Sequence, residues 1–247
     1  TPFMSHISYN PFLAFAIYLL LHEVFFNTSI NSMARFIYSF FAITMSINMF
    51  ITGGRAGQVV FFVMIILLFF QYYQKKLLAL IVSTVVVVGI FFSAYQSSEI
   101  FQQRVDQAIN EASDPNLWKG VNTSIGERFV FAMNSWEIFK ESPLIGIGTG
   151  DFPNEYKKVN ALNTPDSLDT VNPHNMYILV LTQLGVLGLI SLLSIFYFQV
   201  QFAKENKSIF LKNTGIALPI LFLVIMLSDS YLLGHFTTFL FVFFSSF

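Results

Sequence analysis

Residues 169–189 of the chain, DTVNPHNMYILVLTQLGVLGL, place a histidine directly before a long apolar run. Asn172 is a plausible helix cap and Pro173 suits the first helical position, so His174 is expected in the first turn. There the positive end of the helix dipole would attract anions and keep the imidazole neutral. A neutral imidazole is the usual general base near neutral pH, so His174 is a candidate catalytic base. The alternative is a histidine that only caps or anchors the helix end.

A second candidate lies in ITGGRAGQVV at 51–60, where glycines and an arginine interrupt an apolar hairpin. Glycine allows the backbone to turn sharply and to approach a ligand closely. The planar guanidinium of Arg55 offers paired donors that match two oxygens of a phosphate. Arg55 is therefore a candidate phosphate ligand. The alternative is an arginine that only extends its charge to a membrane interface.

A third candidate is Arg128, near the start of the helical pattern SIGERFVFAMNSWEIFKE. It would add a second cation for the same phosphate, or it is a solvated charge at a helix end. The glycines of GIGTGD at 146–151 have the spacing G-x-G-x-G and no strand–helix unit around them, which argues against a dinucleotide site. A tight loop that returns the chain to the membrane is favoured. Asp229 and His235 flank a break, LSDSYLLGH, and are weaker candidates for lining the same cavity.

Composition places these residues in a membrane protein. Hydrophobic residues make up 55% of the chain and charged residues only 11%, against about 25% in a typical soluble domain. The net charge of −1 gives no sign of a nucleic-acid partner. The absence of cysteine excludes disulfides, zinc–thiolate sites and thiol nucleophiles. No pair of histidines at helical spacing with a carboxylate indicates a metal site, so we expect neither metal nor cofactor.

The apolar segments predict an all-α, polytopic bundle of transmembrane helices, since a span needs about 20 apolar residues. The candidate spans are 10–26, 34–51, 58–73, 77–95, 176–202 and 215–227, and the segment 235–247 is too short to span alone. The predicted organisation is one membrane domain, with four helices in 1–95, a large loop in 96–173 and further transmembrane helices in 174–247. We interpret the chain as part of a longer polytopic protein.

The large loop contains two amphipathic helical patterns. The apolar positions are Phe101, Val105, Ala108 and Ala112 in the first, and Phe129, Ala132, Met133, Trp136 and Phe139 in the second. Each forms a stripe suited to lying on the bilayer surface or to packing across the helix tops. The basic residues of the short loops fall on alternate turns: Arg35, Lys75, Lys76, Lys204, Lys207 and Lys212. That side is predicted to be cytoplasmic, which makes the large loop external.

Taken in order, the motifs TGGRAG, GERFVFAMNSWEIFKESPLIGIGTGDF and PHNMYILVLTQLGVLGL resemble the O-antigen ligase family and its wider superfamily. That superfamily includes Wzy-type O-antigen polymerases and bacterial protein O-oligosaccharyltransferases. The resemblance covers the chain from about residue 5 onward and corresponds to the C-terminal half of such enzymes. It implies a membrane-embedded, GT-C-like glycosyltransferase of the bacterial inner membrane, with a metal-independent active site that faces the periplasm.

The resemblance also implies substrates and residue roles. The donor would be a glycan on undecaprenyl diphosphate, and the acceptor of a ligase would be a hydroxyl of lipid A–core. Arg55 and Arg128 match the arginines that hold the diphosphate, with Arg55 counted as catalytic as well. His174 matches the histidine that assists the acceptor hydroxyl, and Asn175 is its companion at the diphosphate. A single displacement would invert the anomeric configuration without the carboxylate pair of many glycosidases.

Four other functions remain open at this point. A polymerase, or a protein O-oligosaccharyltransferase, would use the same donor chemistry on another glycan or on a protein acceptor. A transporter of lipid-linked glycan is a remote alternative, because transporters place charged residues near the bilayer midplane and here they gather at one face. A structural membrane protein would leave the arginines and the histidine unexplained. Among these functions, we therefore favour an O-antigen ligase.

Overall fold

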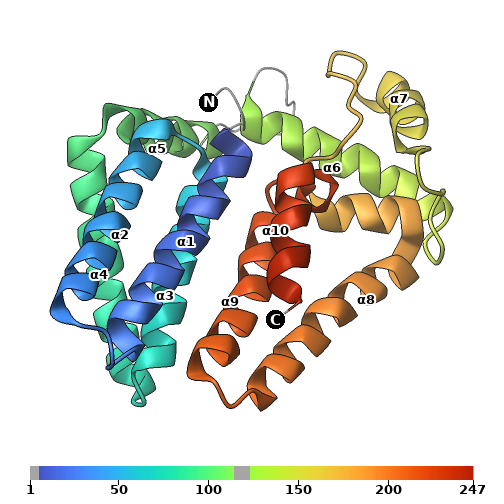
Figure 1. Cartoon of the computed structure of the whole chain (residues 1–247). Helices are drawn as coiled ribbons and strands as arrows, with labels where there is room; N and C mark the ends of the chain where they lie inside the picture. The colour runs from blue at the N-terminus through green and yellow to red at the C-terminus, as the bar shows by residue number, and fades with distance from the viewer. Residues whose placement is uncertain (1–5, 114–122, 247) are drawn as a thin grey trace. The chain divides into compact units, whose positions relative to one another are not determined.

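The computed structural model describes residues 6–113 and 123–246, and within these ranges it contains helices and no strand. The all-α class predicted from the sequence is confirmed. Figure 1 shows the elements along the chain. They are α1 (His6–Phe26), α2 (Ser32–Thr52), α3 (Arg55–Tyr72), α4 (Lys76–Ser97), α5 (Glu99–Ala112), α6 (Ser124–Glu141), α7 (Phe152–Asn163), α8 (Met176–Glu205), α9 (Ile209–Ile225), η2 (Tyr231–Leu233) and α10 (His235–Ser245).

Five helices are long and apolar enough to cross a membrane: α1, α2, α3, α4 and α8. Each coincides with a span predicted from the sequence to within a few residues at either end. The sixth predicted span, 215–227, corresponds to α9, which has 17 residues, and α10 has 11. The protein is thus a multi-pass membrane protein, whereas the division into 1–95, 96–173 and 174–247 stays a prediction.

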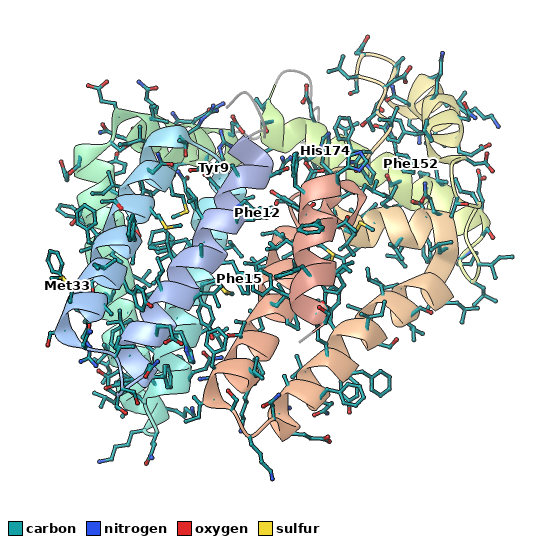
Figure 2. The ribbon with its side chains drawn as sticks, in the orientation of Figure 1. Tyr9, Phe12, Phe15, Met33, Phe152 and His174 are labelled. Carbon is teal, nitrogen blue, oxygen red and sulfur yellow. The ribbon has the colours of Figure 1, made fainter. Side chains whose placement is uncertain are left out.

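The chain forms two compact units. The first comprises Thr1–Val105, Gln199–Ile225 and His235–Phe247, and the second comprises Asp106–Phe198 and Met226–Gly234. In the first unit α1 packs against α2, α3 and α9. Phe15 of α1 is buried there, whereas Met33 of α2 is 67% exposed and projects away from the bundle, as befits a lipid-facing side chain (Figure 2).

The second unit is organised by a break in α8. Gly185 has φ +67° and ψ −165°, so the helix stops and restarts there and its two parts run in different directions (Figure 1). A break leaves backbone groups without partners, which costs several kcal/mol in an apolar environment. Residues 143–148, in the loop after α6, supply those partners.

The replacement bonds run both ways between the loop and the broken helix. The N–H of Ile147 donates to the carbonyl of Thr182 at 3.0 Å, and the N–H of Gly148 donates to the carbonyl of Gln183 at 3.0 Å. In return, the carbonyl of Pro143 accepts from Val186 N–H at 2.9 Å, and that of Leu144 accepts from Leu187 N–H at 3.3 Å. The glycine loop predicted at 146–151 therefore has a structural role, because its first residues complete the backbone hydrogen bonding of α8.

Two glycines make this close approach possible. Gly146 has φ +71°, and a Cβ there would collide with the backbone of Gln183 and Leu184. A Cβ on Gly185 would collide with the backbone of Leu144 and Ile145. Both positions therefore require glycine for two reasons: the backbone has a positive φ, and there is no space for a Cβ.

The face that α6 buries differs from the apolar stripe read from the sequence. Instead of the stripe of Phe129, Ala132, Met133, Trp136 and Phe139, it buries Gly126, Val130, Phe131, Asn134, Ser135 and Ile138. The two polar members are tolerated inside because they are bonded, with Asn134 contacting Tyr156 and Ser135 Oγ donating to the carbonyl of Phe131. The apolar stripe is not this buried face, and its members Met133 and Trp136 are exposed, so its place on the bilayer surface stays a prediction.

We predict that Gly185→Ala destabilises the protein markedly and that Gly89→Ala does not. Alanine at 185 combines a strained positive φ with a collision against backbone that has no room to move. Gly89 lies inside α4 with no atom within 4 Å of an added Cβ, so alanine there should be neutral or stabilising by up to about 1 kcal/mol. Thermal unfolding of both variants in detergent measures the difference, and equal melting temperatures would contradict this account.

Candidate active site

His174 lies just before α8 rather than within it, which corrects the predicted cap. The helix begins at Met176, and Asn175 is its cap: the Asn175 Oδ1 accepts from the N–H groups of Tyr177 and Ile178 at 3.0 and 3.1 Å. His174 has φ +52° and is the only non-glycine residue with positive φ among those that the structure describes. Asn172, the expected cap, instead holds this turn, because its Oδ1 accepts from His174 N–H at 2.9 Å.

The start of α8 is tied to the segment after α9. Asn175 Nδ2 donates to the carbonyl of Leu227 at 3.1 Å, and Met176 N–H donates to the carbonyl of Met226 at 2.9 Å. These two bonds fix the segment 226–230 beside the histidine. Asn175 was expected to be a companion at the diphosphate, and that role stays a prediction; its amide here joins two parts of the second unit.

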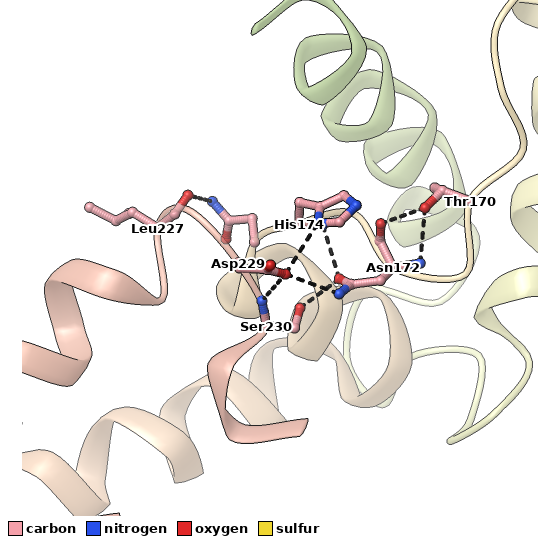
Figure 3. A network of polar contacts seen from close by, with 7 residues as sticks. Thr170, Asn172, His174, Leu227, Asp229 and Ser230 are labelled. Carbon is pink, nitrogen blue, oxygen red and sulfur yellow. Dashed lines mark hydrogen bonds and ion pairs between the residues drawn. The ribbon is translucent and has the colours of Figure 1, made fainter. Parts of the chain in front are cut away.

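The result is a pair between His174 and Asp229, shown in Figure 3. Nδ1 of the imidazole lies 3.2 Å from Oδ1 of the carboxylate. The same oxygen accepts from the N–H of Ser230 at 2.8 Å and from Asn172 Nδ2 at 3.2 Å. Ser230 Oγ donates to Asn172 Oδ1 at 2.7 Å, which closes the network. Asp229, a weaker candidate in the sequence, is therefore the direct partner of the histidine.

The electrostatics of the pair favour an ionised Asp229. Burial raises the pKa of its carboxyl, but the hydrogen bonds from His174, Ser230 and Asn172 and the charge of His174 outweigh that effect, and the net pKa lies below the ordinary value of 3.8. The stabilisation from these bonds is therefore complete above pH 3.8 and is lost as the pH falls through the lowered pKa. At neutral pH the carboxylate is present as an acceptor.

An ionised carboxylate fixes the histidine tautomer. It can only accept hydrogen bonds, so Nδ1 must carry the proton and Nε2 is left as the basic nitrogen. The His174 side chain is 39% exposed, whereas Asp229 is 20% exposed, so the imidazole is reachable while its partner is shielded. The arrangement suits a general base whose protonated form is stabilised by the carboxylate behind it.

Arg128 lies on α6, the helix whose Phe131 contacts the imidazole of His174. On α6 it lies one turn before Phe131, so the two side chains share a face of the helix. The Phe131 ring is 5.9 Å from the imidazole of His174, centroid to centroid. The charge of Arg128 also acts on Tyr231, two residues beyond Asp229. Burial raises the pKa of Tyr231 to about 12, and the positive charge of Arg128 opposes that rise. Arg128 is exposed and lies in the same unit as His174, on the helix that carries Phe131 to the imidazole.

Arg55 lies in the first unit, where it is the first residue of α3. The preceding glycines make the turn from α2, with φ +71° at Gly53 and +113° at Gly54. Asn10 of α1 secures that turn by donating to the carbonyl of Gly53, and it accepts from Thr52 Oγ1 at 3.2 Å. The glycines of this motif therefore position the arginine at a helix N-terminus, where backbone N–H groups also favour anions.

The sequence missed the pairing of His174 with Asp229, because 55 residues separate them and nothing local indicates contact. The signal that was available is the break LSDSYLLGH, which places an acid outside the apolar helices. Asn172 and Ser230 complete the pair and were also missed as partners. Among the described residues, no group of three or more histidine, aspartate or glutamate side chains is arranged to hold a metal ion.

Loss of the Asn175 side chain should act on stability first. Asn175→Ala removes the cap of α8 and the bond to Leu227, so we expect the unfolding free energy to fall by about 1 kcal/mol and turnover to fall with it. Asn175→Asp keeps the cap acceptor and should restore much of the stability. Thermal unfolding and donor binding are the two measurements. Unchanged stability together with weaker donor binding would instead make Asn175 a direct ligand.

Asp229→Asn should impair turnover far more than folding. An amide at 229 can donate to Nδ1, which moves the proton to Nε2 and removes the base. We expect kcat of glycan transfer to fall by about 100-fold to 10,000-fold, the range attributed to a positioned general base, while donor binding is kept. Asp166→Asn, a change at an exposed acid, is the matched control. Comparable activity in the two variants would show that Asp229 does not act on the histidine.

Comparison with known proteins locates these residues in a recognised region. A family model described as O-antigen ligase matches residues 40–193, which include Arg55, Arg128 and His174, while Asp229 lies beyond the match. No curated protein matches the chain. The matched region covers more than half of the sequence, and it contains all three motifs on which the resemblance was based. The chain belongs to the O-antigen ligase family.

Proposed function

We propose that this protein is an O-antigen ligase, which transfers a glycan from undecaprenyl diphosphate to lipid A–core at the periplasmic face of the inner membrane. The observation that carries the proposal is the His174–Asp229 pair, in a chain of this family whose α6 also carries the exposed Arg128. One reachable base and one exposed cation are the groups that a glycosyl transfer from a diphosphate requires.

The proposed step is a single displacement. Nε2 of His174 takes the proton of the acceptor hydroxyl, and the oxygen attacks the anomeric carbon of the donor sugar. The bond between that carbon and the diphosphate oxygen breaks, and the electron pair leaves with the diphosphate. The configuration inverts, because nucleophile and leaving group lie on opposite sides of the carbon. Asp229 stabilises the imidazolium that forms, since the carboxylate lies against the protonated ring.

The arginines act on the leaving group in this proposal. Negative charge accumulates on the diphosphate as the glycosidic bond breaks, so fixed cations stabilise the transition state more than the bound substrate. Arg128 is assigned to the diphosphate beside His174. Arg55, in the first unit, is assigned to diphosphate binding as the family resemblance implies, through its guanidinium and the N–H groups at the start of α3. Arginine stays protonated at any relevant pH, so this mechanism uses no metal ion.

The membrane part offers support for a lipid-linked donor. A cleft of about 780 Å³ opens in the first unit between α1, α2, α3 and α4. Its lining is almost wholly apolar and includes Phe50 and Ile51, just before the glycine turn that carries Arg55. A polyprenyl chain has the chemistry to occupy such a cleft, with its diphosphate at the turn.

The test uses the full-length protein in liposomes with lipid-linked O-glycan and lipid A–core supplied together, with a metal chelator present. Wild-type protein and Arg35→Ala, a change on the predicted cytoplasmic side, should move glycan onto lipid A–core. We expect Arg55→Ala and His174→Ala to lose transfer by at least about 100-fold, and His174→Ala to retain donor binding.

Products are separated by size and by the lipid that they carry. Longer glycans that remain on undecaprenyl diphosphate would make the protein a polymerase with the same apparatus, and glycan on a protein acceptor would make it an oligosaccharyltransferase. Full activity of Arg55→Ala or His174→Ala would overturn the assigned roles. Transfer that stops with the chelator and returns with added metal would overturn the metal-independent mechanism.

A further inference from the structure

A cleft of about 680 Å³ lies between α6 and α7, and its lining includes none of His174, Asp229 and Arg128. The outer face of α6 forms one wall, with Met133, Trp136 and Glu137. The end of α7 forms the other wall, with Asn163 and Thr164. The apolar stripe that the sequence predicted is therefore not buried; part of it lines an open, partly polar cleft.

The large apolar side chains on the α6 wall of this cleft are exposed rather than buried. Trp136 is 54% exposed and Met133 is 39% exposed. The indole of Trp136 lies against the ring of Phe139, with 4.9 Å between centroids and 36° between planes. A tryptophan held by a neighbouring ring, with much of its surface uncovered, offers a flat and rigid contact at little conformational cost.

Polar groups border that aromatic surface. The carboxylate of Glu137 is held by Lys140 at 2.5 Å and remains 45% exposed, so it can still accept hydrogen bonds. The amide of Asn163 is exposed at the opposite wall. An indole flanked by a carboxylate and an amide matches a sugar ring, which has one apolar C–H face and a rim of hydroxyls. Tryptophan stripes that face lipid need no such acceptors.

The floor of the cleft is fixed by a buried network. Asn134 is 1% exposed, and its Nδ2 lies 2.7 Å from Thr164 Oγ1 and 3.3 Å from Asn160 Oδ1. Asn160 Nδ2 donates to Asp169 Oδ1 at 2.9 Å, so the network also ties α7 to the loop that leads to His174. The walls are thus held apart at a set distance, which lowers the cost of binding.

The cleft shares α6 with the reaction site. Phe131 contacts the imidazole of His174, and Trp136 follows five residues later, about 7–8 Å along the helix axis. We propose that this cleft is a glycan-binding subsite, in which Trp136 stacks on a sugar ring and Glu137 and Asn163 bind its hydroxyls. The inference rests on the proposed glycan transfer, whose donor and acceptor both carry sugars beyond the reacting atoms.

Binding is tested apart from transfer. The tryptophans of this sequence are Trp118 and Trp136, so a full-length variant in which Trp118 and every tryptophan outside this sequence are changed to phenylalanine leaves Trp136 as its only indole. The full-length variant in nanodiscs is titrated with two lipid-free probes: core oligosaccharide released by mild acid from lipopolysaccharide, and O-glycan released from its carrier lipid. We expect a saturable change in Trp136 emission with at least one probe, and the probe that acts identifies the bound substrate. No response to either, or quenching by bromine-labelled phospholipid instead, would overturn the proposal in favour of a membrane contact.

Transfer kinetics supply the second readout. Trp136→Ala should raise the KM of the glycan substrate by about tenfold and leave kcat within about twofold, and Trp136→Phe should recover most of the loss. Tyr197→Ala, at an aromatic residue that is 58% exposed elsewhere in the same unit, is the matched control. An unchanged KM in Trp136→Ala alongside normal wild-type transfer would refute the subsite and leave the proposed function standing. Trp136-dependent glycan binding without any transfer would refute the function and keep the subsite.

Discussion

The exchange of hydrogen bonds between residues 143–148 and the break in α8 is the constraint on which the second unit depends. Backbone groups inside a membrane have no water to turn to, so an apolar helix can be interrupted only where other backbone replaces its lost partners. The loop after α6 does this with two donors and two acceptors. That pairing ties the loop that follows α6 to α8, and so limits where the C-terminal end of α6 can lie.

The site itself is a product of loop geometry rather than of helix position. His174 adopts a left-handed backbone conformation, secured by Asn172 beneath it and by the cap residue after it. This turn sends the imidazole toward Asp229 instead of along the helix axis. A carboxylate at hydrogen-bond distance acts more strongly on a ring than the partial charge of a helix end, whose influence fades within a turn. The pair therefore dominates the chemistry of the histidine.

Much of this fold was predictable, because a long apolar run in a bilayer forms a membrane-spanning helix and charged residues mark where the helix ends. The positions of five spans followed from that rule alone. The inner face of α6 did not, since Asn134 and Ser135 are buried through bonds that no periodicity reveals. Within the site, Arg55, Arg128 and His174 were recognisable as residue types in a pattern, whereas Asp229 required knowledge of which loops meet. Contacts between distant segments are set by packing, and a single sequence does not display them.

The break at Gly185 also determines how well the length of α8 matches the thickness of the bilayer. Thirty helical residues would extend about 45 Å if straight, well beyond the hydrocarbon thickness of about 30 Å. The twenty residues after the break, 186–205, extend about 30 Å, which matches that thickness without tilt or local thickening of the bilayer. The shorter piece before it is free to run in another direction under α6. The interruption therefore removes a hydrophobic mismatch that an unbroken α8 would impose on the membrane.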